Sequence, residues 1–278
     1  MPGHRLGQGT PYLLPRDDRL VWFTCRWTER VLRVSLPADL APQDRQGVMT
    51  ALASLEQALG LRFDASAPAE TAHIVLVLGE PDAAKSGRTV ADCAVSAGEG
   101  RLAAALVHAQ VALQRSNESV LGKAVPLGPD EWLGALIHEL GHALGFQGHL
   151  QSGAGPMVRN VEQVRAVGAR VRRGETLEAP TLRALYALPS GSVLRRDRLP
   201  AGRTADLDRL AGLADAAGYR GPFVRVGDRA ARLEWRHRSG RYVSAWLPGL
   251  ARVVRSPGAL EIVPDPLAAA WLAGLAPR

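Results

Sequence analysis

The sequence predicts an α+β protein in which one long amphipathic helix follows a group of β-strands. Three patterns indicate this fold class. Residues 73–78 form an almost continuous apolar run of strand length, which is typical of a central strand buried on both faces. Residues 31–36 alternate between apolar and polar side chains, as in a strand with one buried face. Residues 129–144 instead repeat apolar side chains at the helical period.

The same periodicities predict the elements between these segments. A helix is expected over residues 42–59, because a proline opens the segment and aliphatic side chains recur on one side of it. A short strand is predicted at 61–63. Two longer strands, 90–95 and 102–113, flank a glycine-containing turn. The expected order is therefore strand, helix, several strands and a long helix.

The C-terminal part of the chain is predicted to begin after a boundary rich in Pro, Gly, Ser and Arg at residues 189–203. Before this boundary, helices are expected at 160–173 and 177–188. Beyond it we expect a mostly-β region with flanking helices, with elements at 205–217 (helix), 224–226, 231–235, 242–246 and 251–254 (strands) and 267–275 (helix). The predicted organisation is an N-terminal extension (1–28), a main domain (29–190) and a C-terminal region of unknown role (191–278).

Composition and charge limit the classes of partner. Hydrophobic residues make up 46% of the 278 residues, yet nothing approaches the run of about eighteen apolar residues that a membrane helix needs, so no membrane span is predicted. The formal net charge is +7. The basic residues are almost all arginines, and they are scattered, without a recognition motif. We therefore expect no nucleic-acid partner. The oligomeric state is not predicted.

The predicted helix over residues 129–144 contains the candidate metal-binding and catalytic residues of the chain. His138 and His142 are four residues apart, so both imidazoles project from one face of the helix and can bind one Zn²⁺. Glu139 lies beside them and can take a proton from a zinc-bound water without being a ligand. A helix start at Gly128-Pro129-Asp130-Glu131 supports the assignment, because a proline and two acids suit a first helical turn.

A third ligand is expected shortly after the helix. Gly145 is placed where the chain must leave the helix, and glycine can adopt the positive φ of a sharp exit. His149, four residues later, can then return to the metal. Three histidines with one open position are typical of a catalytic zinc site. Glu162, twenty residues after His142, is an alternative third ligand of the kind that a second helix supplies in thermolysin-like enzymes.

Residues 138–149 resemble the metzincin motif HExxHxxGxxH, which in that family precedes a methionine turn. The chain departs from the motif by one residue, because Gly148 occupies the place of the third histidine and His149 follows it. The segment Gly155-Pro156-Met157 is similar in sequence and spacing to the turn of the matrixin branch. The resemblance covers roughly residues 29–190. It implies a metzincin-like catalytic domain with a twisted mixed β-sheet and an active-site helix.

The resemblance also implies roles for individual residues. His138, His142 and His149 would bind Zn²⁺, Glu139 would be the general base, and Met157 would pack beneath the metal. The implied activity is that of a zinc-dependent endopeptidase acting on peptide or protein substrates. Two alternatives remain open at this point: a zinc hydrolase of a non-peptide amide, and a catalytically silent binding protein that zinc stabilises.

The two cysteines bear on location. Cys25 and Cys93 are far apart in sequence and neither belongs to a CxxC pair, so one disulfide and two separate thiols are both open. The first residues show no secretory signal. We expect a secreted or periplasmic protein whose signal peptide is absent from this sequence, with a cytoplasmic protein as the alternative.

Overall fold

The computed structural model of the protein divides into two compact units. One unit comprises Thr24–Ser192 and is called the metal-site unit below. The other comprises Gly9–Phe23 together with Val193–Arg278 and is called the second unit. The backbone is described for residues 12–16, 19–79, 87–98, 101–118, 124–146, 148–150, 155–158, 160–198, 220–226, 231–236, 242–247, 250–256 and 259–262. Side chains are described for residues 23–79, 87–95, 103–117, 125–146, 148–150, 155–158 and 160–193.

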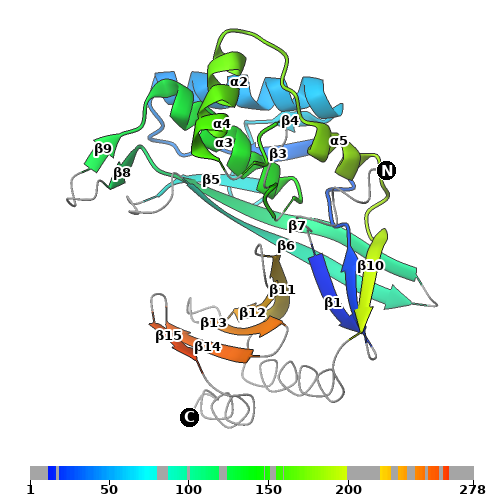
Figure 1. Cartoon of the computed structure of the whole chain (residues 1–278). Coiled ribbons are helices and arrows are strands. Elements are labelled where there is room, and N and C mark those ends of the chain that lie inside the picture. Colours follow the sequence, from blue (N-terminus) through cyan, green and yellow to red (C-terminus); the bar gives the residue numbers. More distant parts are fainter. Residues whose placement is uncertain are drawn as a thin grey trace. The chain divides into compact units, whose positions relative to one another are not determined.

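A five-stranded mixed sheet forms the base of the metal-site unit, in the order β4-β3-β5-β7-β6. The strands β4, β3, β5 and β7 are parallel, whereas β6 pairs antiparallel with β7 and forms one edge (Figure 1). The alternating and apolar runs therefore predicted the strands correctly, and the α+β class is confirmed. The bounds are β3 (Val31–Ser35), β4 (Arg62–Asp64), β5 (Ile74–Leu78), β6 (Gly87–Gly98) and β7 (Arg101–Leu113).

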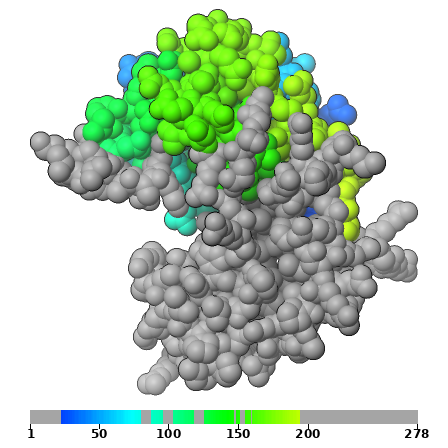
Figure 2. All heavy atoms as spheres, in the orientation of Figure 1, coloured from blue at the N-terminus to red at the C-terminus, as the bar shows by residue number. Residues whose placement is uncertain are grey.

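The helices α2, α3 and α4 lie on the same side of this sheet (Figure 1). Figure 2 shows the segment from α3 to α5, in green to yellow-green, on the face of this unit that is turned toward the viewer. Helix α2 spans Pro42–Leu59, as predicted, and Gly60 ends it with a φ of 68°. The other bounds are α3 (Pro129–Ala143), α4 (Val161–Arg172) and α5 (Pro180–Tyr186).

Two glycines allow α3 and α4 to pack with their backbones in contact. A Cβ atom at Gly134 would overlap the Val164 main chain, and a Cβ atom at Gly168 would overlap the Asp130 carbonyl. The side chains of Asp130 and Arg172 form an ion pair across the same interface. This close packing sets the position of α3, the helix that carries the histidines.

Helix α5 is shorter than predicted, and one β-hairpin was not predicted. Helix α5 begins at Pro180 rather than at Leu177, because proline suits the first helical turn and lacks the N–H that an earlier start would require. A β-hairpin precedes α3 that periodicity did not predict, formed by β8 (Ser116–Glu118) and β9 (Ala124–Pro126). Strands of three residues are too short to show an alternating pattern.

The second unit contains two antiparallel sheets. One has the order β1-β2-β10, so two strands within the predicted N-terminal extension pair with a strand that follows the metal-site unit. The other is an antiparallel meander, β11 to β15. The predicted helices at 205–217 and 267–275 lie outside the described residues. The bounds are β1 (Tyr12–Arg16), β2 (Arg19–Phe23), β10 (Val193–Arg198), β11 (Arg220–Val226), β12 (Ala231–Arg236), β13 (Tyr242–Leu247), β14 (Leu250–Ser256) and β15 (Ala259–Ile262).

The chain enters and leaves the metal-site unit at one place. The Thr24 N–H donates to the Ser192 carbonyl at 3.0 Å, and the Gly191 N–H donates to the Thr24 carbonyl at 2.7 Å. The Thr24 hydroxyl adds a bond to the Pro189 carbonyl at 2.9 Å. These bonds close the unit although its ends are far apart in sequence. The predicted main domain, residues 29–190, falls between them.

Substituting Gly168 by Ala tests the helix contact. Alanine favours an exposed helix by up to about 1 kcal/mol over glycine. We nevertheless expect Gly168→Ala to lower the free energy of unfolding by about 1–3 kcal/mol, because the new methyl group would overlap the Asp130 carbonyl. Urea denaturation measures the change. The control is Ala166→Gly on the exposed side of α4, which should cost about 1 kcal/mol from helix propensity alone. Stabilisation by Gly168→Ala would contradict the close contact.

Candidate metal centre

Helix α3 ends sharply after its second histidine. The helix begins after Gly128 with Pro129 in its first turn, and its buried face runs through to Ala143. Gly145 then adopts the predicted positive φ, 110°. A Cβ atom at Gly145 would overlap the Cys25 carbonyl, so a side chain is excluded by contact as well as by conformation. The exit therefore requires glycine.

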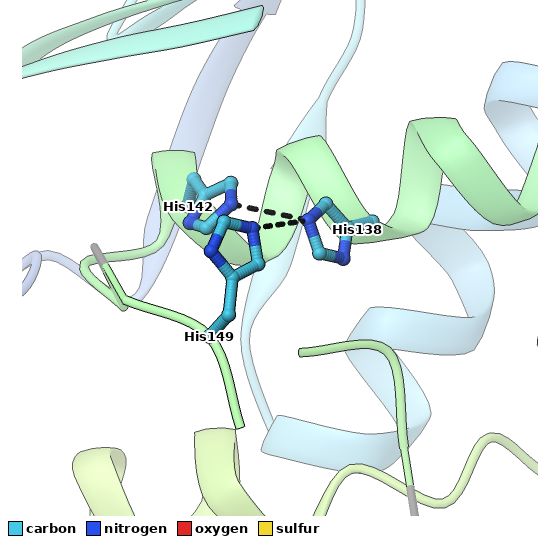
Figure 3. Close-up of side chains that lie close together, drawn as sticks. All are labelled: His138, His142 and His149. Carbon is cyan, nitrogen blue, oxygen red and sulfur yellow. Dashed lines mark hydrogen bonds between the residues drawn. The ribbon is translucent and has the colours of Figure 1, made fainter. Parts of the chain in front are cut away.

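Three histidine side chains converge beyond this exit. The Nε2 atoms of His138 and His149 are 3.1 Å apart, and those of His142 and His138 are 3.2 Å apart (Figure 3). Nitrogen ligands about 2.0–2.1 Å from a tetrahedral zinc would be about 3.3 Å apart. These two separations are therefore close to those of ligands sharing one metal ion. The ligand atoms of all three residues lie within 4.8 Å of one another, and the three residues could hold one ion.

Two main-chain carbonyls determine which ring nitrogens are available. The Nδ1 atom of His138 is 2.5 Å from the Pro156 carbonyl oxygen, and that of His142 is 2.5 Å from the Phe146 carbonyl oxygen. A carbonyl oxygen can only accept, so each Nδ1 carries the proton and each neutral ring has its lone pair on Nε2. The two Nε2 lone pairs face each other across 3.2 Å. Such an arrangement is stabilised by a cation between them, and it fits the orienting role of outer-shell acceptors in metal sites.

The pKa values of the two helix histidines are lowered, which favours their neutral form. Burial is the main cause that lowers the pKa of His138 from 6.5 to about 4. Burial also lowers the pKa of His142 well below 6.5, and the nearby His138 and His149 rings lower it further. His142 is only 7% exposed. Neutral imidazole is the form that binds a metal, so the two histidines do not have to lose a proton first.

The extra residue before His149 does not prevent the third histidine from reaching the cluster. Leu150, directly after His149, donates its N–H to the Met157 carbonyl at 2.8 Å and forms a β-bridge with Val158. This pairing holds the returning chain beside the turn at Gly155-Pro156-Met157. The alternative ligand Glu162 is exposed on α4 and does not belong to the cluster. The structure therefore brings together His149, and not Glu162, with the helix histidines.

Met157 packs against the metal-site helix at a glycine. The Met157 side chain is fully buried, and its sulfur lies where a Cβ atom of Gly141 would be. Gly141 precedes His142, so the methionine turn contacts α3 directly beside a ligand. No role was predicted for Gly141 from the sequence. A glycine inside a helical pattern costs about 1 kcal/mol relative to alanine, so its presence there indicates that packing requires a glycine.

Glu139 faces the edge strand of the sheet. It is 8% exposed, and its Oε2 atom is 2.6 Å from the hydroxyl oxygen of Thr89 in β6. The same hydroxyl oxygen is 2.9 Å from the Glu139 main-chain carbonyl oxygen. Thr89 was not predicted as a site residue, because it lies fifty positions before Glu139 in sequence and no local pattern links them.

The last carbonyls of α3 are satisfied by side chains from distant parts of the unit. The Trp27 Nε1–H donates to the Ala143 carbonyl at 2.9 Å, and the Tyr186 hydroxyl donates to the Leu144 carbonyl at 3.0 Å. These bonds pair carbonyls that the helix itself leaves free. They also support the exit that returns His149 to the cluster.

A disulfide joins Cys25 to Cys93, with Cα atoms 6.3 Å apart. The structure thereby decides between the two alternatives that the sequence left open. Cys25 belongs to the segment that contacts the exit of α3, and Cys93 belongs to β6. The disulfide therefore ties the strand that carries Thr89 to the end of the metal-site helix, and it weakly suggests an extracellular location.

No protein-family model matches the chain, and no curated protein matches it. Among the helices that the structure describes, none is long and apolar enough to cross a bilayer.

Zinc binding should depend on His149 and not on Glu162. We expect His149→Ala to lower zinc affinity at least about 100-fold, because one of three ligands is lost. Glu162→Gln should bind zinc like the wild type, because Glu162 is exposed outside the cluster. Competition with a chromophoric chelator at pH 7 measures both affinities. Loss of zinc in Glu162→Gln together with retention in His149→Ala would reverse the ligand assignment.

The stability of the zinc-free protein should fall as the pH falls below about 6.5. The pKa values of His138 and His142 are lowered in the folded state, so the unfolded state binds more protons in this range. His138 should contribute a slope of up to about 1.4 kcal/mol per pH unit between pH 6.5 and about 4, and His142 should contribute a slope of the same sign below pH 6.5. Urea denaturation of chelator-treated protein at pH 7.0 and 5.0 measures it. The double variant His138→Gln, His142→Gln should lose most of this dependence, and an unchanged slope would refute the assignment.

Proposed function

We propose that the protein is a zinc-dependent endopeptidase. The observation that carries the proposal is the convergence of His138, His142 and His149, with the buried residue Glu139 next to His138 on the same helix. Three imidazole ligands leave one position open in a tetrahedral site, which is typical of catalytic rather than structural zinc. A structural site would not require a carboxylate at this place. The mixed sheet and the histidine-bearing helix also agree with the metzincin resemblance.

The donor set favours zinc among the common metals. Neutral imidazole nitrogens suit zinc, whereas magnesium and calcium prefer oxygen ligands. When bound, zinc would lower the pKa of a water molecule and polarise a substrate carbonyl. The main-chain acceptors at Pro156 and Phe146 hold two of the rings in the orientation that ligation needs.

Glu139 moves the proton in the proposed reaction. Its carboxylate takes a proton from the attacking water and passes it to the amine that leaves when the peptide bond breaks. Glu139 follows His138 on α3 and does not belong to the histidine cluster, which agrees with the role of a base that is not a ligand. Its burial between helix and sheet restricts the positions that the carboxylate can adopt.

The β6 edge of the sheet is suited to align a substrate. Strand β7 lies between β5 and β6, whereas β6 ends the sheet on this side. Its Thr89 contacts Glu139. An extended peptide can add to such an edge through main-chain hydrogen bonds. The peptide bond to be cleaved would then lie near the general base.

The disulfide supports an exported enzyme. Disulfides form and persist in oxidising compartments and are rare in the cytosol of most cells. Cys25–Cys93 would keep β6 attached to the end of the metal-site helix in such an environment.

Cleavage of a peptide mixture by the wild type and by Glu139→Gln tests the proposal. Glutamine keeps the shape of the side chain but cannot accept the proton, so we expect a rate at least about 100-fold lower with zinc retained. Mass spectrometry of the new termini identifies the cleaved bonds. The matched control is Glu162→Gln, which makes the same substitution on the exposed side of α4 and should cleave at the wild-type rate.

Each other outcome has a defined meaning. Equal cleavage by the wild type and Glu139→Gln would show that the activity does not come from this site. A zinc-loaded wild type that cleaved no peptide would refute the endopeptidase assignment. Hydrolysis of small acyl amides by that same protein would then favour an amide hydrolase.

A further inference from the structure

The Thr89 hydroxyl contacts two acceptor atoms of one residue. Its oxygen is 2.6 Å from the Glu139 Oε2 atom and 2.9 Å from the Glu139 main-chain carbonyl oxygen. A hydroxyl has one proton to donate and two lone pairs to accept with. It can therefore donate to only one of these acceptors at a time.

The shorter distance indicates where the hydroxyl proton lies when Glu139 is ionised. A separation of 2.6 Å falls within the range of about 2.5–2.7 Å for a hydroxyl that donates to a carboxylate. Such a bond restricts the position of the carboxylate, so the Glu139 carboxyl group is held against β6.

A glycine two residues earlier makes room for this arrangement. A Cβ atom at Gly87 would lie 2.7 Å from the Glu139 Cγ atom and 3.2 Å from its Oε1 atom. Real Cβ atoms do not approach other heavy atoms as closely as 2.7 Å, so any side chain at residue 87 would displace the carboxyl group. Gly87 and Thr89 together define the position of Glu139 beside the strand.

We propose that Thr89 is a positioning residue that holds the Glu139 carboxyl group against β6. Gly87 provides the space for this contact. The proposal rests on the proposed function, because it assigns Glu139 the role of the general base.

The test compares three substitutions in the zinc-loaded protein. Thr89→Val removes the hydroxyl with little change of shape, and we expect kcat for peptide cleavage to fall about 10- to 100-fold with KM nearly unchanged. Thr89→Ser keeps the hydroxyl and should restore kcat to within about threefold of the wild type. The matched control is Thr50→Val on α2, where the lost hydroxyl bonds only to the Gln46 carbonyl of the same helix, and its kcat should not change.

Crystal structures of the same variants provide a readout that does not depend on activity. The Glu139 carboxylate should leave its position beside residue 89 in Thr89→Val and keep it in Thr89→Ser. Gly87→Ala gives a second route to the same result, because it should displace the carboxylate while the Thr89 hydroxyl is intact, and kcat should fall as well.

The outcomes separate this proposal from the proposed function. If cleavage depended on Glu139 but Thr89→Val kept the wild-type kcat, the positioning role would be refuted and the endopeptidase assignment would stand. If the wild type cleaved no peptide, the endopeptidase assignment would fail. The crystal structures would then test the contact between Thr89 and Glu139. An unmoved Glu139 carboxylate in Thr89→Val would refute the positioning role.

Discussion

The close approach of Gly145 to the Cys25 main-chain carbonyl is the contact on which the histidine cluster depends. At this point α3 must stop directly after His142, because one more helical turn would carry the chain away from the ligands. A positive φ at Gly145 turns the backbone so that Phe146 can accept from the His142 ring and His149 can return. The Trp27 and Tyr186 side chains then pair the carbonyls at the end of the helix.

Main-chain carbonyl oxygens orient two of the three histidine rings. Carbonyl oxygens do not titrate, so the tautomers that they impose on His138 and His142 persist over a wide pH range. One of these carbonyls belongs to Pro156, in the turn that also buries Met157 against Gly141. The turn therefore contributes to the site in two ways, by packing under the helix and by fixing one ligand ring.

Strand β6 connects the candidate base to the rest of the unit. It lies at the edge of the sheet, it contacts Glu139 through Thr89, and its Cys93 is bonded to Cys25. Because Cys25 also contacts Gly145, the strand, the helix and the helix exit form a closed set of contacts. A displacement of β6 would thus affect both the candidate base and the segment that returns His149. The disulfide restricts such a displacement because it joins β6 to the segment that contacts the helix exit.

The sequence by itself determined the elements whose causes are local. The apolar and alternating runs predicted the strands of the five-stranded sheet, and Pro42 and the helical period predicted α2. The spacing of His138 and His142 placed two candidate ligands on one helix face. Gly145 was predicted as the exit because positive φ is a property of a single residue. Only the tertiary structure decided the choice of His149 over Glu162, the Cys25–Cys93 bond, the edge position of β6 and the contact of Thr89 with Glu139. Each of these joins residues whose separation in sequence carries no periodicity, so they follow from how the chain packs rather than from any local pattern.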